Sequence, residues 1–371
     1  TKDTNLFFLF KIQLCFQIQS CTMQSIHHRK GENKMRYLEH RFCRKMIRYG
    51  SVVVFGFIMI LLSQLTGLHE FMFPEGISVV LGVWAIEKQP WRVNKVQLFF
   101  MMIIGSICAV CIVKYLPIPL IFQVLIGFIL VGISLLVTKT SFAPVVSAFM
   151  LPILLQSDSW LFPLLVIGYI GIIIAVQTLY QKTGLTQKIV SSHTSFQLKN
   201  ELFHWCILLI MFSVLSIYPT VTHSIYFMVP PLIITFVEMA EVTSPARKKP
   251  LKVYAIMALA PWIGTAWRFL SVYTPIPTYI TFPCALVCLC VLMELIQFPF
   301  AAAGSLVTLP FLFSAETLIW YPVQSMIGLI FFMVFPILIF RNKTNPPKHK
   351  IYSLHKKHAV SPKADTTTSI Q

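Results

Sequence analysis

Long apolar runs, separated by short polar or basic stretches, fill the sequence from residue 51 to residue 340. Runs such as VVVFGFIMILL and GYIGIIIAV are continuously apolar, which is typical of helices surrounded by lipid. Strands of a membrane barrel would instead alternate apolar and polar positions. The pattern therefore predicts an all-α, polytopic membrane bundle.

The runs divide into about twelve segments. They cover about 50–67, 71–86, 97–114, 117–138, 142–155 and 160–179, and then 203–218, 225–241, 252–270, 276–296, 298–313 and 317–340. Several approach the roughly 20 residues that a helix needs to cross a bilayer. The second and fifth segments of each series are shorter and contain proline or glycine.

The second series repeats the first. The stretch YLPIP begins at Tyr115 and YTPIP begins at Tyr273, an offset of 158 residues. The same offset pairs Phe142-Ala143 with Phe300-Ala301, Ser147 with Ser305, Leu151-Pro152 with Leu309-Pro310, and Asp158 with Glu316. These matches predict a tandem duplication, with a first membrane repeat at 35–180, a linker at 181–201, a second repeat at 202–340 and a basic tail at 341–371. Each Pro-x-Pro is expected to start the fourth helix of its repeat.

Basic residues predict the topology. If all twelve segments cross, every Lys and Arg from Met35 onward lies on one side, except Lys114 and Arg268. If one short segment were re-entrant, every later segment would have the opposite orientation in the membrane, and the basic residues would no longer gather on one side. The positive-inside rule then places both termini in the cytoplasm of a bacterial inner membrane. An even number of crossings per repeat makes the two repeats parallel, related by an axis along the membrane normal.

Composition excludes several classes of protein. The net charge of +17 is spread over loops and tail, a pattern that suits lipid headgroups rather than nucleic acid. The nine cysteines are scattered, mostly in apolar runs, and imply no disulfide framework or metal site. His69 and His223 lie in equivalent loops without a supporting carboxylate cluster. No cofactor or metal is expected, and the bilayer is the expected partner. The sequence leaves open whether the protein forms a homo-oligomer.

Residues 1–34 do not resemble the rest of the chain. The stretch Arg29-Lys30-Gly31-Glu32 could be encoded by a sequence close to a ribosome-binding site, just before Met35. We therefore expect 1–34 to be a translated leader. The alternative is a signal-like hydrophobic segment, NLFFLFKIQLCF, which lacks a small-residue cleavage site.

The four short segments are the candidate solute pathway. Interrupted helices in corresponding positions of two repeats are the best sequence indication of a transport site, because a helix that starts inside the membrane leaves N–H groups for a ligand. The predicted pathway residues are Pro74, Glu75, Gly76, Ser78, Pro144, Ser147, Pro230, Pro231, Thr235, Gly304, Ser305 and Thr308. The alternative is that these small residues only allow helices to pack closely.

Few charges lie within the apolar segments. Glu294 occupies the position of Leu136 in the first repeat, so this charge breaks the symmetry. A carboxylate at that depth is costly, which makes Glu294 the preferred candidate for proton coupling. Glu238 is a second candidate, although it could simply lie at the inner membrane edge. Arg268 could extend to the outer interface.

The motif-bearing segments resemble the HPP family of integral membrane proteins. Its Pro-Pro-x-Gly-Ala-Ser stretch is similar to Pro74, Gly76 and Ser78, and to Pro230 and Pro231. Its cytoplasmic loop is similar to Gln89, Pro90, Arg92 and Asn94, and to Ser244, Pro245 and Arg247. Its third motif is similar to SFAPV at 141–145 and QFPFAAAG at 297–304. Some family members are linked to nitrite transport, so the resemblance implies transport of a small anion.

These features together predict a secondary transporter that moves a small solute, an anion among the candidates, through a pathway between the repeats. A non-transporting membrane scaffold or partner subunit is the alternative. A membrane-embedded enzyme is disfavoured because the sequence contains no HExxH, GxSxG or Walker A motif.

Overall fold

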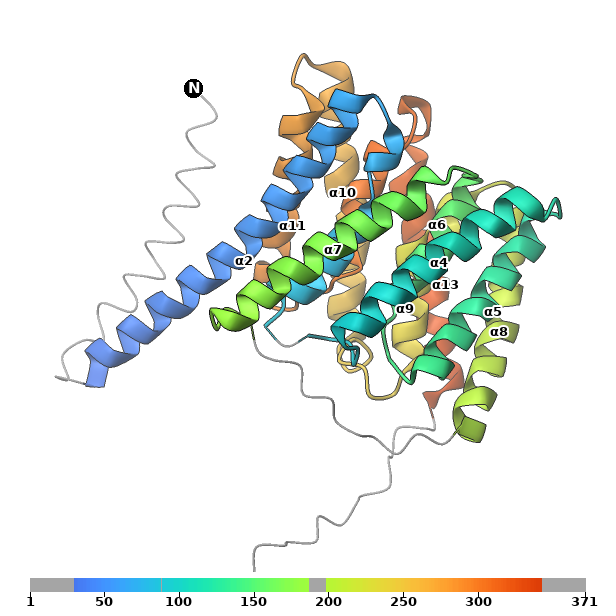
Figure 1. The fold of residues 1–371 in the computed structure, drawn as a ribbon, viewed down its shortest axis with the longest axis horizontal. Coiled ribbons are helices and arrows are strands. Elements are labelled where there is room, and N and C mark those ends of the chain that lie inside the picture. Colours follow the sequence, from blue (N-terminus) through green and yellow to red (C-terminus); the bar gives the residue numbers. More distant parts are fainter. Residues whose placement is uncertain (1–29, 88, 187–197, 342–371) are drawn as a thin grey trace, which may run out of the picture.

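A computed structural model describes residues 30–87, 89–186 and 198–341, with side chains from residue 42 onward except Leu198. These residues form helices and no β-strand. In the part of the chain that the structure describes, eight helices are long and apolar enough to cross a membrane, so the chain is a multi-pass helical membrane protein (Figure 1). They are α2 (Lys30–Thr66), α4 (Lys95–Tyr115), α5 (Leu120–Thr138), α7 (Leu161–Lys182), α8 (Leu198–Val221), α10 (Pro250–Tyr273), α11 (Thr278–Ile296) and α13 (Trp320–Ile339).

The other four predicted segments are short, interrupted helices. Their elements are η1 (His69–Phe71), α3 (Pro74–Val80) and η2 (Leu81–Ala85); α6 (Val145–Leu155); η3 (Ile225–Met228) and α9 (Pro230–Ala240); and α12 (Ala303–Thr308), η4 (Leu309–Phe311) and η5 (Ala315–Thr317). The α-helix of each segment begins at or just after a proline or a run of small residues. At about 1.5 Å per residue none of these α-helices spans the roughly 30 Å hydrocarbon core. The eight long helices account for the remaining predicted segments.

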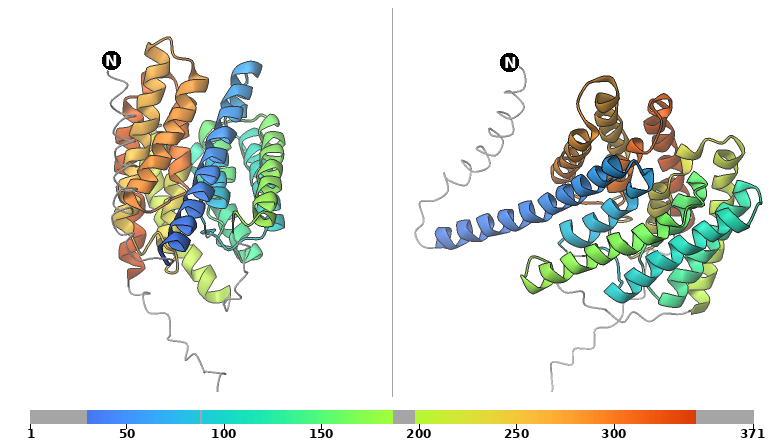
Figure 2. Two further views of the ribbon diagram at one scale, coloured as in Figure 1. Left: turned by 90° about the vertical axis from the view of Figure 1, so that its left-hand side faces the viewer. Right: turned by 45° about the horizontal axis from the view of Figure 1, so that its top comes forward.

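The short helices lie inside the bundle and the long helices surround them (Figure 2). Every residue of α3, η2 and α12 is buried, and so is nearly all of α6 and α9. The long helices expose large apolar side chains outward, among them Val54, Ile104, Leu164 and Ile210. The long helices therefore separate the interrupted helices from lipid.

Two predicted helix starts are confirmed. Pro119 is the N-cap of α5 and Pro277 is the N-cap of α11. The same two helices end alike, at Lys139 and Gln297, with φ values of 52° and 53° in the left-handed region. This conformation lets the cap N–H groups bond to the last carbonyl groups of the helix. The two helices that follow the Pro-x-Pro stretches therefore begin and end alike.

One end of the bundle gathers basic residues, and we call it the basic end. Lys95 donates to Thr178 Oγ1 at 2.8 Å and Lys252 donates to the Ile296 carbonyl at 2.7 Å. Arg247 donates to the carbonyl oxygens of Met239 and Phe340, both at 2.7 Å. Lys252 and Arg247 therefore satisfy carbonyl groups that helix ends leave without intrahelical partners.

Contacts between the two halves are reciprocal. The first helix of each half packs on the fourth helix of the other, α2 on α11 and α8 on α5. The interrupted helices behave alike, because α3 packs on α12 and α9 packs on α6. Every one of these contacts joins residues from opposite halves of the chain.

Some domain predictions lie outside the described residues. They are most of the expected leader at 1–34, most of the linker at 181–201 and nearly all of the tail at 341–371.

Close packing of α10 on α12 can be tested at Gly264. A Cβ at this position would lie 2.1 Å from the Val307 carbonyl oxygen, whereas a Cβ at Gly168 in α7 would meet nothing within 4 Å. We expect Gly264→Ala to destabilise the protein by about 1–3 kcal/mol. Gly168→Ala should be neutral or stabilising by up to about 1 kcal/mol. Thermal unfolding of the two purified variants measures the difference, and equal melting temperatures would contradict this packing.

Candidate functional site

Two interrupted helices from opposite halves meet through their serines. The Oγ atoms of Ser78 in α3 and Ser305 in α12 are 2.6 Å apart, and the Ser305 N–H donates to Ser78 Oγ at 3.2 Å. Ser305 Oγ also donates to the Pro74 carbonyl at 3.1 Å. A consistent assignment has Ser78 donating to Ser305 Oγ, so each hydroxyl is used as both donor and acceptor. This places three predicted pathway residues in direct contact.

Glycine allows this close approach. A Cβ on Gly304 would lie 2.6 Å from Leu81 Cδ1 and 3.3 Å from the Ser78 backbone nitrogen. A Cβ on Gly76 would lie 2.8 Å from Phe73 Cδ1. Both glycines were predicted in the pathway, and in this conformation both are positions of tight packing.

The reciprocal pair, α6 with α9, contains five other predicted pathway residues, which are Pro144, Ser147, Pro230, Pro231 and Thr235. Pro144 is the N-cap of α6, and Pro230 and Pro231 open α9. Ser147, which the predicted repeat pairs with Ser305, is fully buried, and its hydroxyl has no hydrogen-bond partner among the described residues. When the openings of the two segments are aligned at Pro74 and Pro230, Glu75 pairs with Pro231 and Ser78 pairs with Ile234. The second half therefore has no serine at the position of Ser78. The two crossings therefore share a packing arrangement but differ in polarity.

Two threonines bond within their own helices. Thr235 Oγ1 donates to the Pro231 carbonyl at 2.8 Å, and Thr308 Oγ1 contacts the carbonyl oxygens of Gly304 and Ser305 at 3.1 and 3.0 Å. Both threonines are fully buried. Their hydroxyls donate hydrogen bonds to carbonyl groups of their own helix, and they do not connect different helices.

Glu75 is the most unusual side chain of the site. It is completely buried, and neither carboxylate oxygen has a hydrogen-bond partner among the described residues. The preceding turn is fixed by the Phe73 N–H, which contacts Met59 Sδ at 3.3 Å. Met59 lies seven residues before the end of α2, or roughly 10 Å along the helix axis. The carboxyl group is therefore enclosed well inside the bundle.

Glu238 lies at the basic end, where it joins the two halves. Its Oε1 accepts a hydrogen bond from Trp91 Nε1 at 2.9 Å. Trp91 is itself buried, edge-on to Phe142, and a Cβ on Gly82 would lie 2.2 Å from its ring. Trp91 therefore couples the loop after η2 to the end of α9.

Glu294 also lies at the basic end and also has partners. Tyr49 donates to Glu294 Oε1 at 2.6 Å, and Lys45 forms an ion pair with Oε2. The side chains of Lys45 and Glu294 are 41% and 43% exposed. Both predicted proton-coupling candidates are thus partnered at one end of the bundle, whereas Glu75 is enclosed without a partner.

The sequence did not identify the residues that bind these carboxylates. Trp91, Tyr49 and Lys45 were not among the predicted site residues. Lys45 and Tyr49 are four residues apart on one face of α2, which indicates a shared neighbour. The sequence could not show which of the other helices supplies it.

Searches against protein-family models, curated proteins and solved structures return no match for this chain.

Hydrogen bonding at the first crossing can be tested with two equivalent serines. We expect Ser305→Ala to lower the free energy of unfolding by about 1–3 kcal/mol, because the Pro74 carbonyl and the Ser78 hydroxyl lose their partner in a buried place. Ser147→Ala removes a hydroxyl that bonds to nothing and should cost much less. Thermal unfolding distinguishes them; a larger loss for Ser147→Ala would contradict the hydrogen-bond assignment.

Proposed function

We propose that the protein is a secondary transporter of a small solute, with its pathway along the interrupted helices between the two halves. The observation that carries the proposal is the buried carboxyl group of Glu75 beside the crossing of α3 and α12. Ionisable groups enclosed in a membrane protein are rare and costly, and they commonly belong to substrate or proton pathways. Purely structural packing gives no reason to keep an unpartnered carboxyl group there.

We further propose that the chain passes through the membrane twelve times, with both termini in the cytoplasm of a bacterial inner membrane. Support comes from contacts at the ends of α6. The residues just before α6 lie at the basic end, where the Ser141 N–H donates to the Arg92 carbonyl. Its other end is marked by Gln156, whose Nε2 donates to Gln123 Oε1 near the start of α5. A short helix and its flanking residues can therefore connect opposite ends of the bundle.

The proposed repeats are parallel and related by a pseudo-twofold axis along the membrane normal. Reciprocal packing of α2 on α11 and α8 on α5 supports this relation, as does the reciprocal packing of the interrupted helices. Membership of the HPP family remains a proposal that rests on the resemblance of the short motifs. A small anion such as nitrite is the solute class that this resemblance suggests.

The pathway is closed at Ser78 and Ser305 in the present conformation, because their hydroxyls contact each other directly. Transport would require α3 and α12 to separate. This closed contact is the observation that favours the alternative, a non-transporting scaffold or partner subunit. Solute flux through proteoliposomes separates the two functions.

Glu75 is the residue that we propose to carry a coupling proton. The equivalent residue in the second half is Pro231, so only one half supplies this carboxyl group. An isolated ionised carboxylate is costly in a low-dielectric interior unless a cation or a hydrogen-bond donor joins it. Binding and release of a proton would therefore be linked to opening of the site.

Coupling through Glu75 can be measured with pyranine-loaded proteoliposomes. We expect addition of nitrite under an inward proton gradient to acidify the interior faster than in protein-free liposomes. Glu75→Gln should abolish this protein-dependent acidification because the amide cannot carry the proton. Glu294→Gln is the matched control, and it should retain acidification and lose at most about 1 kcal/mol of stability, since its ion pair is half exposed.

Acidification that persists in Glu75→Gln and disappears in Glu294→Gln would assign coupling to Glu294 instead. If nitrite and a panel of other small anions move no faster than in protein-free liposomes, the scaffold alternative gains support. Circular dichroism of each variant checks that it is folded before transport is compared.

A further inference from the structure

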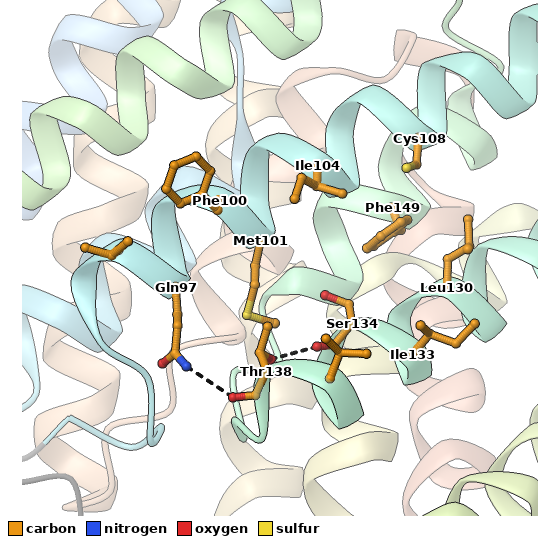
Figure 3. A pocket seen from close by; sticks show the side chains of 12 residues that line it. Gln97, Phe100, Met101, Ile104, Cys108, Leu130, Ile133, Ser134, Thr138 and Phe149 are labelled. Carbon is orange, nitrogen blue, oxygen red and sulfur yellow. Dashed lines mark hydrogen bonds between the residues drawn. The ribbon is translucent and has the colours of Figure 1, made fainter.

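An apolar groove of about 360 Å³ lies between α4 and α5, on the outside of the bundle (Figure 3). Phe149 of α6 forms part of its lining. Phe100, Ile104 and Ile133 line it and are 55%, 53% and 50% exposed, so the groove opens toward the surrounding lipid. It is separate from the crossing of α3 and α12.

The groove has the length of one lipid acyl chain within one leaflet. Along α4 its lining runs from Val96 to Cys108. At about 1.5 Å per residue this is roughly 18 Å, against roughly 15 Å for half of the hydrocarbon core. Because α4 begins at the basic end, the groove extends from that surface to about the middle of the membrane.

Hydrogen-bonded polar side chains line the groove at the basic end. Gln97 Nε2 donates to the Thr138 carbonyl at 3.1 Å, and Thr138 Oγ1 donates to the Ser134 carbonyl at 2.7 Å (Figure 3). Gln97 is also fixed by a capping box with Asn94. These bonds hold the start of α4 against the end of α5, so the mouth of the groove is preformed.

Basic residues surround this mouth. Lys139 is exposed and follows Thr138 directly, and Arg92 is exposed in the loop before α4. Lys95 opens α4, although its amine bonds to Thr178 on the α7 side. Glu87 is the acidic residue of the same loop. The local charge is therefore positive, which suits a phosphate group at the membrane surface.

The second half has tryptophans where the first half has the groove. At the repeat offset, Trp262 replaces Ile104 and Trp267 replaces Ala109. Trp267 Nε1 points to Cys288 Sγ at 3.3 Å, and Cys288 replaces the groove residue Leu130. An indole thus bridges α10 and α11 across the region that stays open between α4 and α5.

We propose that this groove is a specific site for an anionic phospholipid of the leaflet at the basic end. One acyl chain lies between α4 and α5, and the phosphate contacts Lys139 and Arg92. The site is independent of solute transport and would hold equally for a scaffold.

Native mass spectrometry of the full chain tests the site. The protein would be released from nanodiscs that contain equal parts of phosphatidylglycerol and phosphatidylcholine, and the retained lipid counted. We expect wild type to retain phosphatidylglycerol preferentially. Ile104→Trp introduces the residue of the second half and should reduce retention about tenfold, equivalent to losing about two buried methylene groups. Ile133→Trp, on the facing helix, should act alike.

Two further variants make the result specific. Leu164→Trp, on the exposed face of α7, adds the same indole away from the groove and should change nothing. Lys139→Gln should reduce the preference for phosphatidylglycerol about fivefold while the total lipid retained changes less. Equal effects of Ile104→Trp and Leu164→Trp would overturn the site, and equal retention of the two lipids by wild type would overturn its anionic specificity.

Discussion

Inside a bilayer every backbone polar group must find its partner within the protein, and this constraint shapes the whole molecule. Interrupted helices are stable only where other helices shield their backbone groups from lipid. The eight long helices form that cover, and their outward faces are apolar. Within it, Ser305 satisfies the Pro74 carbonyl, while Arg247 satisfies carbonyl groups at the ends of α9 and α13. The backbone carbonyl at the start of α3 is thus satisfied by a side chain from the other half of the chain.

A symmetric framework carries asymmetric chemistry. In the first seam between the halves, where α2 packs on α11, Tyr49 and Lys45 bind Glu294. In the second seam, where α8 packs on α5, Phe128 and Phe212 stack with ring centroids 4.1 Å apart. The first seam can respond to charge, whereas the second depends on apolar contact. The same division applies to the crossings, where the serine pair and the unpartnered carboxyl group belong to α3 with α12. Glu294 and Glu75 thus each belong to only one member of a reciprocal pair of contacts.

The sequence predicted where the helices begin and end better than it predicted which helices contact each other. Apolar length identified the long helices, and Pro119 and Pro277 marked true helix starts, because proline fixes the backbone regardless of surroundings. The rotation of each helix could not be predicted, since lipid-facing and buried positions are both apolar. Ile104 faces outward and Met102 is fully buried, although both are ordinary hydrophobic residues of α4. The partners of Ser78 and Glu294 were hidden for the same reason, being 227 and up to 249 residues away in sequence.

Access of water to the crossing of α3 and α12 tests the transport account without knowledge of the solute. In a variant without native cysteines, Ser78→Cys would be treated in proteoliposomes with a small membrane-impermeant thiol reagent, applied to either side. Ser106→Cys, at an equally buried serine of α4, is the control. The account predicts that position 78 reacts from each side in turn while position 106 stays protected. A position 78 as inert as position 106 from both sides would contradict it.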